Sequence, residues 1–471
     1  MTLSRRKLLA FGFSAIGVNM MKLLLGTYLC NAVLTAGFKA NLANWTYAGK
    51  DVVSASVWGA VILAVKVLNG VSDFPFTGFL DHLNVKIGKR RFGVLVGFAP
   101  LILAFVLFLY PPSDGNLLLN SLWLGALLVL FYFAYSCVML SYYASFSEIT
   151  KDDRDRQFLS NAKSVADVVY NVLGFALIPV LIDFMNIRTI ALCFLPLSLL
   201  ILAGISMVRE DGAGRAPASP RPRFFASIAR TLKNREYSRW MIVFAFMTFS
   251  IQLFLSGQSV FLSGVGHFSG GQIAMINACA FGPVPLTIML YNRVGKRRGF
   301  RFGFVYAMLA FAIAMGVCAL ANAEIVPDAG ARMGVALLSG LICSLGIGTF
   351  FSVTYVIPSH PAAKEAAETG ESKPSMYFAI QGLFGASVTG IAAGPVLVGM
   401  RNFGDLYRIE RVVRDGHIAF ERVRGVGLTP WIPVVVGLSL IACCALTAIL
   451  PEGIASIGKS SPKAGRGPAG R

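Results

Sequence analysis

The sequence predicts an all-α, polytopic membrane protein with about 12 transmembrane helices in two six-helix halves. Of the 471 residues, 56% are apolar and only 14% are charged, and the mean hydropathy is +0.68. Several segments of about 18 or more residues carry almost no charge, which is enough to cross a bilayer of about 30 Å. A water-soluble protein of this length could not bury so much apolar surface. Soluble enzymes, disordered scaffolds and nucleic-acid-binding domains are therefore excluded.

The apolar segments fall into two groups. The first group lies near residues 9–35, 52–80, 92–111, 117–147, 164–186 and 189–208, and the second near 241–263, 271–292, 302–322, 333–358, 376–398 and 432–450. A backbone in lipid must satisfy its hydrogen bonds internally, so segments this long are helices rather than barrel strands. We expect an N-terminal half at 1–208, a cytoplasmic linker rich in Pro and Arg at 209–240, and a C-terminal half at 241–471.

The placement of basic residues sets the expected orientation. With the N-terminus inside, most of the 42 Lys and Arg residues fall in inner segments. This placement explains the net charge of +19 without a nucleic-acid partner, and no obligate protein partner is implied. We expect a multi-pass protein of a bacterial inner membrane with both termini cytoplasmic.

One loop, near 399–431, departs from this charge pattern. It lies on the expected outer side and yet holds many basic residues. Apolar and charged residues alternate on both sides of Asp415-Gly416, which is typical of a β-hairpin. We expect an outer hairpin whose charges are partly paired by Glu410, Asp415 and Glu421, and which acts as a solvated lid or in substrate capture.

An internal repeat supports the two-half arrangement. The sequence Gly-Lys-Arg-Arg occurs at 88–91, after the second segment, and again at 295–298, after the eighth. Six-helix halves related by a parallel repeat are a known carrier plan, with the substrate site between the halves near the bilayer midplane. The repeat either reflects orientation alone or forms an inner gate. The expected gate residues are Arg90, Arg91, Arg297 and Arg298, with Asp81 and Glu148 as ion-pair partners.

Few charged or amide side chains lie inside the expected helices. A charge at mid-bilayer costs a few kcal/mol, so it usually faces a cavity or a partner. Helical spacing places these residues on shared stripes, namely Asn19 and Lys22, then Lys66, Asn69 and Asp73, then Lys163, Asp167 and Asn171. They predict either a polar substrate pocket or structural pairing, for example Lys163 with Asp167. Two lysines against one carboxylate at Lys22, Lys66 and Asp73 favour an anionic solute.

Several motifs of hydrolases, metalloenzymes and redox proteins are absent from the sequence. There is no HExxH, GxSxG or CxxC pair. The eight cysteines lie in apolar runs, as buried hydrophobic residues do. We expect no catalytic residue, no metal site and no cofactor other than H⁺ or Na⁺ as a coupling ion.

Four stretches together resemble a known transporter family. They are Asn69–Asp81 with Gly88–Arg91, Tyr142–Arg154, Leu232–Arg235 and Tyr377–Gly382. They are similar to parts of the second, fourth, seventh and eleventh helices of the glycoside–pentoside–hexuronide:cation symporters. That family, which includes the melibiose permease, belongs to the major facilitator superfamily. The resemblance covers most of the chain and implies the major facilitator fold, with cation-coupled sugar uptake by alternating access.

The resemblance also implies roles for single residues. In the family, two second-helix carboxylates and one fourth-helix carboxylate hold the cation. Asp73 and Asn69 stand at the second-helix positions and Met139 at the fourth-helix position. The expected substrate-binding residues are Asn19, Lys22, Lys66, Tyr135, Tyr143, Lys163 and Gln381. The basic residue that follows the glutamine in the permease is replaced by Ala386.

These replacements bear on the coupling ion. A single carboxylate with two amides and a thioether is a poor sodium site, because hard cations prefer several oxygen ligands. Proton coupling through Asp73, or facilitated exchange without coupling, is therefore favoured over sodium coupling.

The sequence thus predicts a secondary transporter of a sugar, glycoside or sugar acid, with a small-molecule solute and the lipid bilayer as its partners. A first alternative is a carrier of a lysolipid or another amphipathic anion. A second alternative is a membrane-embedded enzyme.

Overall fold

The computed structural model describes most of the chain. The described residues are 4–38, 41–47, 49–82, 87–150, 153–208, 234–369, 374–403, 407–414 and 417–450. For part of α5 and for some other residues inside helices and strands, only the backbone is described. Asp73, Asp81 and Glu148 are among these, so their expected side-chain roles lie outside what the structure describes.

The N-terminal half consists of six helical spans. They are α1 (Arg5–Phe13) with α2 (Ile16–Leu23), η1 (Leu24–Leu29) and α3 (Cys30–Ala32); α5 (Ala55–His82); α6 (Lys89–Phe108); α7 (Leu117–Ala144); α9 (Asp153–Val172) with η2 (Leu173–Leu177) and α10 (Ile178–Ile182); and α11 (Ile187–Phe194) with η3 (Leu195–Leu199) and α12 (Leu200–Ser206). Short helices α4 (Leu42–Trp45) and α8 (Phe146–Ile149) lie in connections.

The C-terminal half repeats this plan. Its spans are α14 (Arg235–Gly264); α15 (Gly270–Phe281) with α16 (Val284–Arg298); α17 (Phe300–Leu320); α18 (Ala329–Thr369); α19 (Pro374–Ile391) with η4 (Ala392–Val396) and α20 (Leu397–Asn402); and η5 (Thr429–Trp431) with α21 (Ile432–Leu446) and η6 (Thr447–Ile449). The first of these spans begins before the apolar segment near 241–263, at the Leu232–Arg235 stretch that resembles a helix entry. Asn234 caps α14 there by accepting from the backbone N–H groups of Glu236 and Tyr237.

The predicted membrane architecture is confirmed within the described segments. Eleven helices there are long and apolar enough to cross a membrane. The predicted second span corresponds to α5, whose apolar part is Ala55–Val71. Each of the expected apolar segments therefore has a helical counterpart, and the fold is an all-α bundle.

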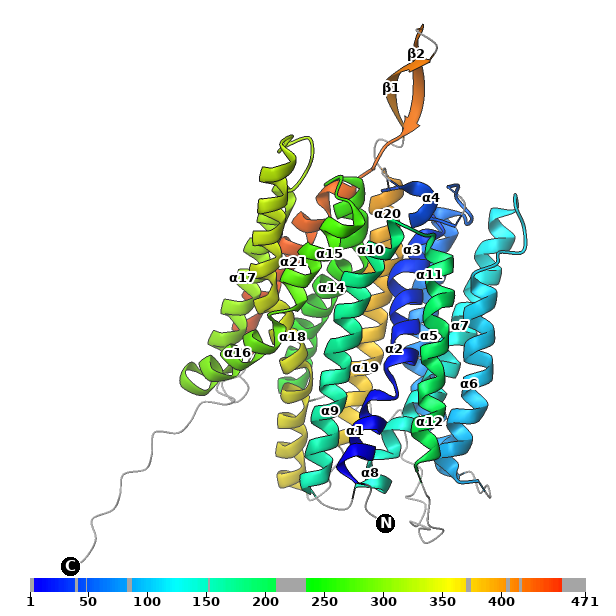
Figure 1. Ribbon diagram of the computed structural model, residues 1–471. Helices are drawn as coiled ribbons and strands as arrows, with labels where there is room; N and C mark the ends of the chain where they lie inside the picture. Colours follow the sequence, from blue (N-terminus) through cyan, green and yellow to red (C-terminus); the bar gives the residue numbers. More distant parts are fainter. Residues whose placement is uncertain are drawn as a thin grey trace, which may run out of the picture.

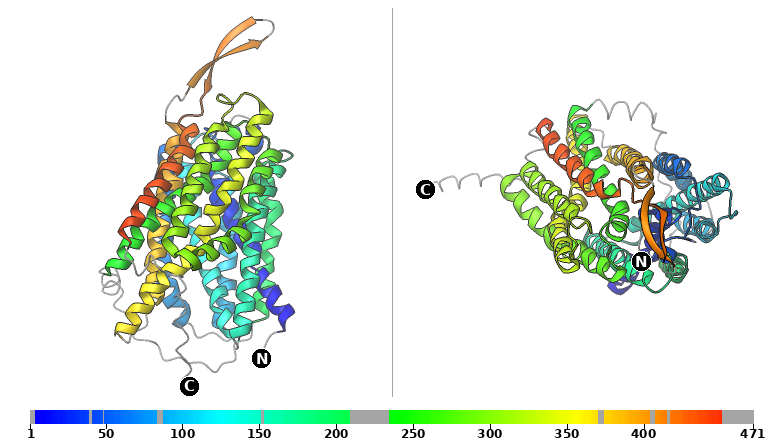
Figure 2. Two further views of the ribbon diagram at one scale, coloured as in Figure 1. Left: turned by 90° about the vertical axis from the view of Figure 1, so that its left-hand side faces the viewer. Right: turned by 90° about the horizontal axis from the view of Figure 1, so that it is seen from above.

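The two halves lie side by side (Figures 1 and 2). They meet along α5 against α19 and η4, and along η2 and α10 against α15. A further contact joins η1 to α14. These helices supply the walls between which a carrier of this plan holds its solute.

The predicted hairpin is also confirmed, and its placement on the outer side stays a prediction. Strands β1 (Tyr407–Arg414) and β2 (His417–Arg424) pair antiparallel, with Arg414 opposite His417. The hairpin stands away from the bundle at the end opposite to the N-terminus (Figure 1). The expected charge pairing by Glu410, Asp415 and Glu421 involves side chains outside the described residues. We refer below to the hairpin end and, opposite to it, to the basic end, where the N-terminus lies.

The repeated Gly-Lys-Arg-Arg sequence occupies two different local structures. A left-handed glycine makes each turn, Gly88 with φ of 92° and Gly299 with φ of 89°. The basic residues follow the turn in the N-terminal half, where they form the first turn of α6. They precede it in the C-terminal half, where they form the last turn of α16. The repeat therefore marks matching loops but presents its arginines differently.

Candidate functional site

Polar side chains of four helices of the N-terminal half gather inside the bundle. We name this group the central polar cluster. Its members come from α2, α5, α7 and α9, and they are Asn19, Lys22, Lys66, Asn69, Tyr132, Tyr135, Ser136, Tyr143, Lys163 and Asp167. The cluster brings together most of the substrate-binding residues expected from the sequence.

One arm of the cluster is a chain of hydrogen bonds across three helices. Tyr135 Oη donates to Asn19 Oδ1 at 2.8 Å, and Asn19 Nδ2 donates to Asp167 Oδ1 at 3.5 Å. Asp167 is also ion-paired with Lys163, one helical turn earlier on α9. Lys163 is buried, whereas the side chain of Asp167 is 41% exposed. The carboxylate of this ion pair is therefore partly accessible.

Lys22 lies on the inner face of its helix. Its Nζ is 4.6 Å from the ring centroid of Tyr135. On the same helix, Gly17 lies so close to η3 that an added Cβ would come 2.0 Å from the Leu197 carbonyl oxygen. Lys22 is five residues further along, about 140° around the helix from that contact. Since Lys22 is nonetheless exposed, and Tyr143 is 47% exposed, open space lies beside the cluster.

Lys66 forms the other arm, at the contact between the halves. Its Nζ donates to Tyr132 Oη at 2.6 Å and lies 4.2 Å from the centroid of that ring. Gly390 of α19 faces it, since an added Cβ there would come 2.9 Å from Lys66 Cβ. A void of about 10 Å³ lies here, between Lys66 and Tyr132 on one side and Ser256 on the other. Lys66 is therefore enclosed between the halves in this state.

Asn69 continues the stripe of α5 on which Lys66 lies. Ser136 Oγ is 3.4 Å from Asn69 Oδ1, which links α5 to α7 next to the buried Met139. The cation-binding role that the resemblance implies for Asn69 and Met139 stays a prediction. Asp73 follows Asn69 by about one turn of α5.

The electrostatic balance of the cluster is positive. It contains three lysines, namely Lys22, Lys66 and Lys163, and Asp167 is its one carboxylate among the described side chains. Aromatic rings face all three ammonium groups, which stabilises their charge in a setting of low polarity. Such an arrangement can hold an anionic group while tyrosine and amide groups bind hydroxyls.

Gln381, the expected substrate-binding residue of the C-terminal half, bonds within that half. Gln381 accepts from Trp240 Nε1 at 3.0 Å and donates to the Thr354 carbonyl oxygen at 2.9 Å. These two hydrogen bonds do not join it to the central polar cluster. Gln258 and Asn277 border an internal void of about 30 Å³ between α14, α15, α17, α18 and α21.

The expected inner-gate residues are dispersed. Arg91 Nη2 donates to the Ser206 carbonyl oxygen at 2.6 Å, at the end of α12. Arg90 is half-buried at the start of α6, whereas Arg297 and Arg298 are exposed at the end of α16. Ion pairs with Asp81 or Glu148 would involve side chains outside the described residues.

A buried arginine locks the two halves together at the hairpin end. Arg401, on α20, donates to the carbonyl oxygens of Ala36 at 2.8 Å and Leu34 at 2.9 Å. It also donates to Asn31, at 3.0 Å to Oδ1 and 3.2 Å to the carbonyl oxygen. Asn31 in turn donates to the Ser256 carbonyl oxygen of α14 at 2.8 Å. This end of the bundle is therefore closed.

A second lock joins α10 to α15. The carboxylate of Asp183 accepts from the backbone N–H groups of Gly270 and Gly271, both at 2.9 Å. A negative charge at a helix N-terminus is favourable because of the helix dipole. Nearby, Asn277 donates to the Phe175 carbonyl oxygen at 2.6 Å. Both sides of the interface are thus fastened toward the hairpin end.

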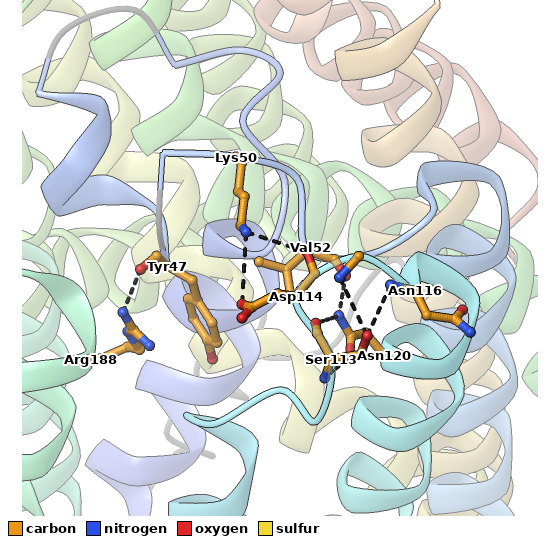
Figure 3. A network of polar contacts seen from close by, with 9 residues as sticks. Tyr47, Lys50, Val52, Ser113, Asp114, Asn116, Asn120 and Arg188 are labelled. Carbon is orange, nitrogen blue, oxygen red and sulfur yellow. Dashed lines mark hydrogen bonds and ion pairs between the residues drawn. The ribbon is translucent and has the colours of Figure 1, made fainter.

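A network of polar contacts holds the loop that carries the acceptors of Arg401 (Figure 3). Asn120 Nδ2 donates to the carbonyl oxygens of Val52 at 2.9 Å and Ser113 at 2.7 Å. Arg188 donates to the Tyr47 carbonyl oxygen at 2.6 Å. Burial raises the pKa of Tyr47 well above its usual value, so its hydroxyl stays a donor, to the Phe108 carbonyl oxygen. The loop is thereby fixed to the N-terminal half.

Comparisons with known proteins identify the family. The sequence model of the family described as "MFS/sugar transport protein" matches residues 10–447, and the chain belongs to this family. This result confirms the resemblance found in the sequence. The chain is an integral, multi-pass membrane protein of the transporter class. No curated protein matches the chain.

Solved structures share the fold at low sequence identity. The nucleoside transporter NupG is 14% identical with a TM-score of 0.63, covering 94% of this chain and 98% of its own. A POT family transporter in complex with a thioalcohol-conjugated peptide is 11% identical with a TM-score of 0.62, covering 95% and 96%. A bacterial homologue of the human lysosomal transporter Spinster is 13% identical with a TM-score of 0.54, covering 96% and 99%. These similarities show the major facilitator fold.

Sequence reasoning overlooked some residues of the site. Asp167 is not among the expected substrate-binding residues, although its spacing allowed either a pocket or a pair with Lys163, and it contacts both Lys163 and Asn19. Tyr132 was not selected because one more tyrosine in an aromatic-rich helix carries no signal of its own. Arg401 is a basic residue on the expected outer side, against the charge rule, and that exception was a usable signal.

Proposed function

We propose that the protein carries a small anionic solute, most simply a sugar acid, across the membrane by alternating access. The observation that supports this proposal is the composition of the central polar cluster, in which three lysines face one described carboxylate. Lys22 and Lys66 would bind the anionic group, while Asn19, Tyr135 and Tyr143 offer hydrogen bonds to hydroxyls. The Lys163–Asp167 pair would fix the polar wall on α9.

In this proposal the basic end is cytoplasmic, in line with the distribution of Lys and Arg. The locks of Arg401 and Asp183 close the outer side, and the exposed face of Lys22, Tyr143 and Asp167 opens toward the inner side. The state described would then be closed to the outside. Breaking the two locks while the inner ends of the halves approach would produce the opposite state.

We further propose that a proton, rather than sodium, drives accumulation. By the resemblance, Asn69 and the buried Met139 stand at positions near Asp73 where the family has carboxylates. Such a site has too few carboxylate oxygens to bind a hard cation such as Na⁺. Asp73 would carry the proton. Asp73→Asn should then abolish accumulation but leave downhill exchange of the solute intact.

Uptake into proteoliposomes tests the proposal. Purified protein is reconstituted, and uptake of a radiolabelled hexuronate is compared with that of the corresponding hexose, with and without a pH gradient or a sodium gradient. We expect hexuronate uptake to exceed hexose uptake and to respond to the pH gradient. Equal uptake of both solutes would refute the anion preference, and stimulation by sodium alone would refute proton coupling.

A further inference from the structure

A lateral crevice in the C-terminal half lies apart from the central polar cluster. It has a volume of about 390 Å³ and is enclosed by α16, α17 and α18 alone. The residues that matter for its chemistry are Leu290, Tyr291, Arg297, Arg298, Phe302 and Tyr306. Its lining includes no residue of the N-terminal half, so it does not belong to the proposed transport site.

The crevice opens on the surface that the bilayer covers. Leu290, Phe302 and Tyr306 line it and are themselves exposed. Leu286 and Met289, which lie next to the lining residues Thr287 and Leu290 on α16, are among the most exposed apolar residues of the described chain, at 69% and 68%. Because these helices cross the membrane, lipid tails contact this surface. The side walls therefore suit an acyl chain.

Two cationic groups stand at the basic end of the crevice. Arg297 and Arg298 are both exposed, and neither has an ion pair or hydrogen bond with any described residue. The guanidinium carbon of Arg298 lies 4.6 Å from the ring centroid of Phe302, which holds the side chain over the crevice. A planar guanidinium binds phosphate oxygens through two parallel N–H groups, so this pair suits a phosphate.

The other copy of the Gly-Lys-Arg-Arg repeat provides a contrast. Arg91 follows the left-handed Gly88, and its guanidinium group donates a hydrogen bond to the Ser206 carbonyl oxygen of α12. Arg297 and Arg298 precede theirs, which places them at the end of α16 and over the crevice. Because the basic residues precede the turn in this copy, Arg297 and Arg298 do not take the place of Arg91 and make no hydrogen bond to a neighbouring described helix.

We infer that the crevice binds an anionic glycerophospholipid from the leaflet at the basic end. Its phosphate would lie on Arg297 and Arg298, and an acyl chain would lie along Leu290, Phe302 and Tyr306. Positive pockets between transmembrane helices on the cytoplasmic side recognise anionic head groups in this way. The wall composition argues against a free phosphate or the transported solute, since neither would contact the apolar surface.

Native mass spectrometry of the full chain in detergent tests this inference. The protein is titrated with dioleoyl phosphatidylglycerol and, separately, with dioleoyl phosphatidylcholine. We expect preferential retention of phosphatidylglycerol. The double variant Arg297→Gln, Arg298→Gln should lose about 30-fold in affinity for phosphatidylglycerol and should no longer distinguish the two lipids.

The control is Arg293→Gln, which removes a charge from an exposed position of the same helix that does not line the crevice. It should retain the preference. Thermal unfolding in detergent shows whether each variant is folded, and the variants change surface side chains only. Retention of phosphatidylglycerol in the double variant, or an equal loss in the control, would overturn the inference. Competition by inorganic phosphate at equal concentration would instead indicate a free-phosphate site. None of these outcomes depends on the identity of the transported solute.

Discussion

Replacing Arg401 with Gln is expected to open the hairpin end of the bundle. Arg401 makes four hydrogen bonds to residues 31–36 of the other half. A hydrogen bond from a charged donor contributes about 1.5 to 3 kcal/mol, and Gln can keep at most part of the set. A net loss of about 3 kcal/mol changes the ratio of closed to open molecules about 150-fold.

The chain contains its own reporter for this opening. Cys30 is buried, one residue before the Asn31 that Arg401 contacts, and it borders the small void beside Lys66. Labelling by a membrane-impermeant maleimide applied from the hairpin side, followed by peptide mass spectrometry, measures its exposure. We expect slow labelling in the native protein and fast labelling after Arg401→Gln. Cys30→Ser in the same background identifies the labelled site.

An unchanged labelling rate of Cys30 in a folded Arg401→Gln protein would refute the lock. Arg401→Lys provides a matched control, because it keeps the charge but offers a different donor geometry. It should give an intermediate rate. If Arg401→Lys labels as fast as Arg401→Gln, closure depends on the donor geometry of the guanidinium group. If it labels as slowly as the native protein, the positive charge alone closes this end.

Three further predictions follow from the same contacts. Asp183→Asn should raise Cys30 labelling about fivefold, since it removes a charge worth about 1 kcal/mol at the N-terminus of α15, and native labelling would contradict this. Gly264→Ala should also favour the open state, because its Cβ would lie 1.7 Å from the Gly37 carbonyl oxygen, and labelling as slow as in the native protein would disprove the close approach. Lys163→Gln alone should destabilise the protein in thermal unfolding by about 1 to 2 kcal/mol more than Lys163→Gln with Asp167→Asn, because it leaves a partly buried carboxylate unpaired. Equal stability of the two would show that the pair does not matter.

The spans, their order and the hairpin could be predicted from the sequence because each has a strong local cause. A membrane helix needs a long apolar run, and the turn at Asp415-Gly416 lies between alternating residues. The start of α14 lies before its apolar run, because its cap, Asn234, lies in a polar stretch. Only the family resemblance at Leu232–Arg235 indicated this helix entry.

The candidate site was predictable where a costly charge marks it. Lys22, Lys66 and Lys163 stand out because lysine inside a membrane helix is rare, and the structure brings all three next to aromatic rings. The partner of Lys66 was not predictable, because Tyr132 differs from other tyrosines only through packing between helices distant in sequence. Tyr135, in contrast, is among the residues that the family resemblance implies, and its ring lies beside Lys22.

The inner gate shows the limit of motif reasoning. Matching loops and a shared sequence suggested matching roles for Arg91 and Arg298. The structure places the left-handed glycine at the first residue of one motif, Gly88, and directly after the other, at Gly299. The basic side chains therefore belong to the start of α6 in one case and to the end of α16 in the other. Turn geometry over two or three residues is not encoded in the repeat itself.

The most direct test of the proposed function is the ratio of hexuronate to hexose uptake in native protein and in Lys66→Gln. The control is Lys50→Gln, which removes the same charge from an exposed ion pair with Asp114 outside the cluster. We predict a ratio well above one in the native and control proteins, falling at least tenfold in Lys66→Gln, because the enclosed ammonium group selects the anion. A ratio that stays the same in all three proteins would contradict the account.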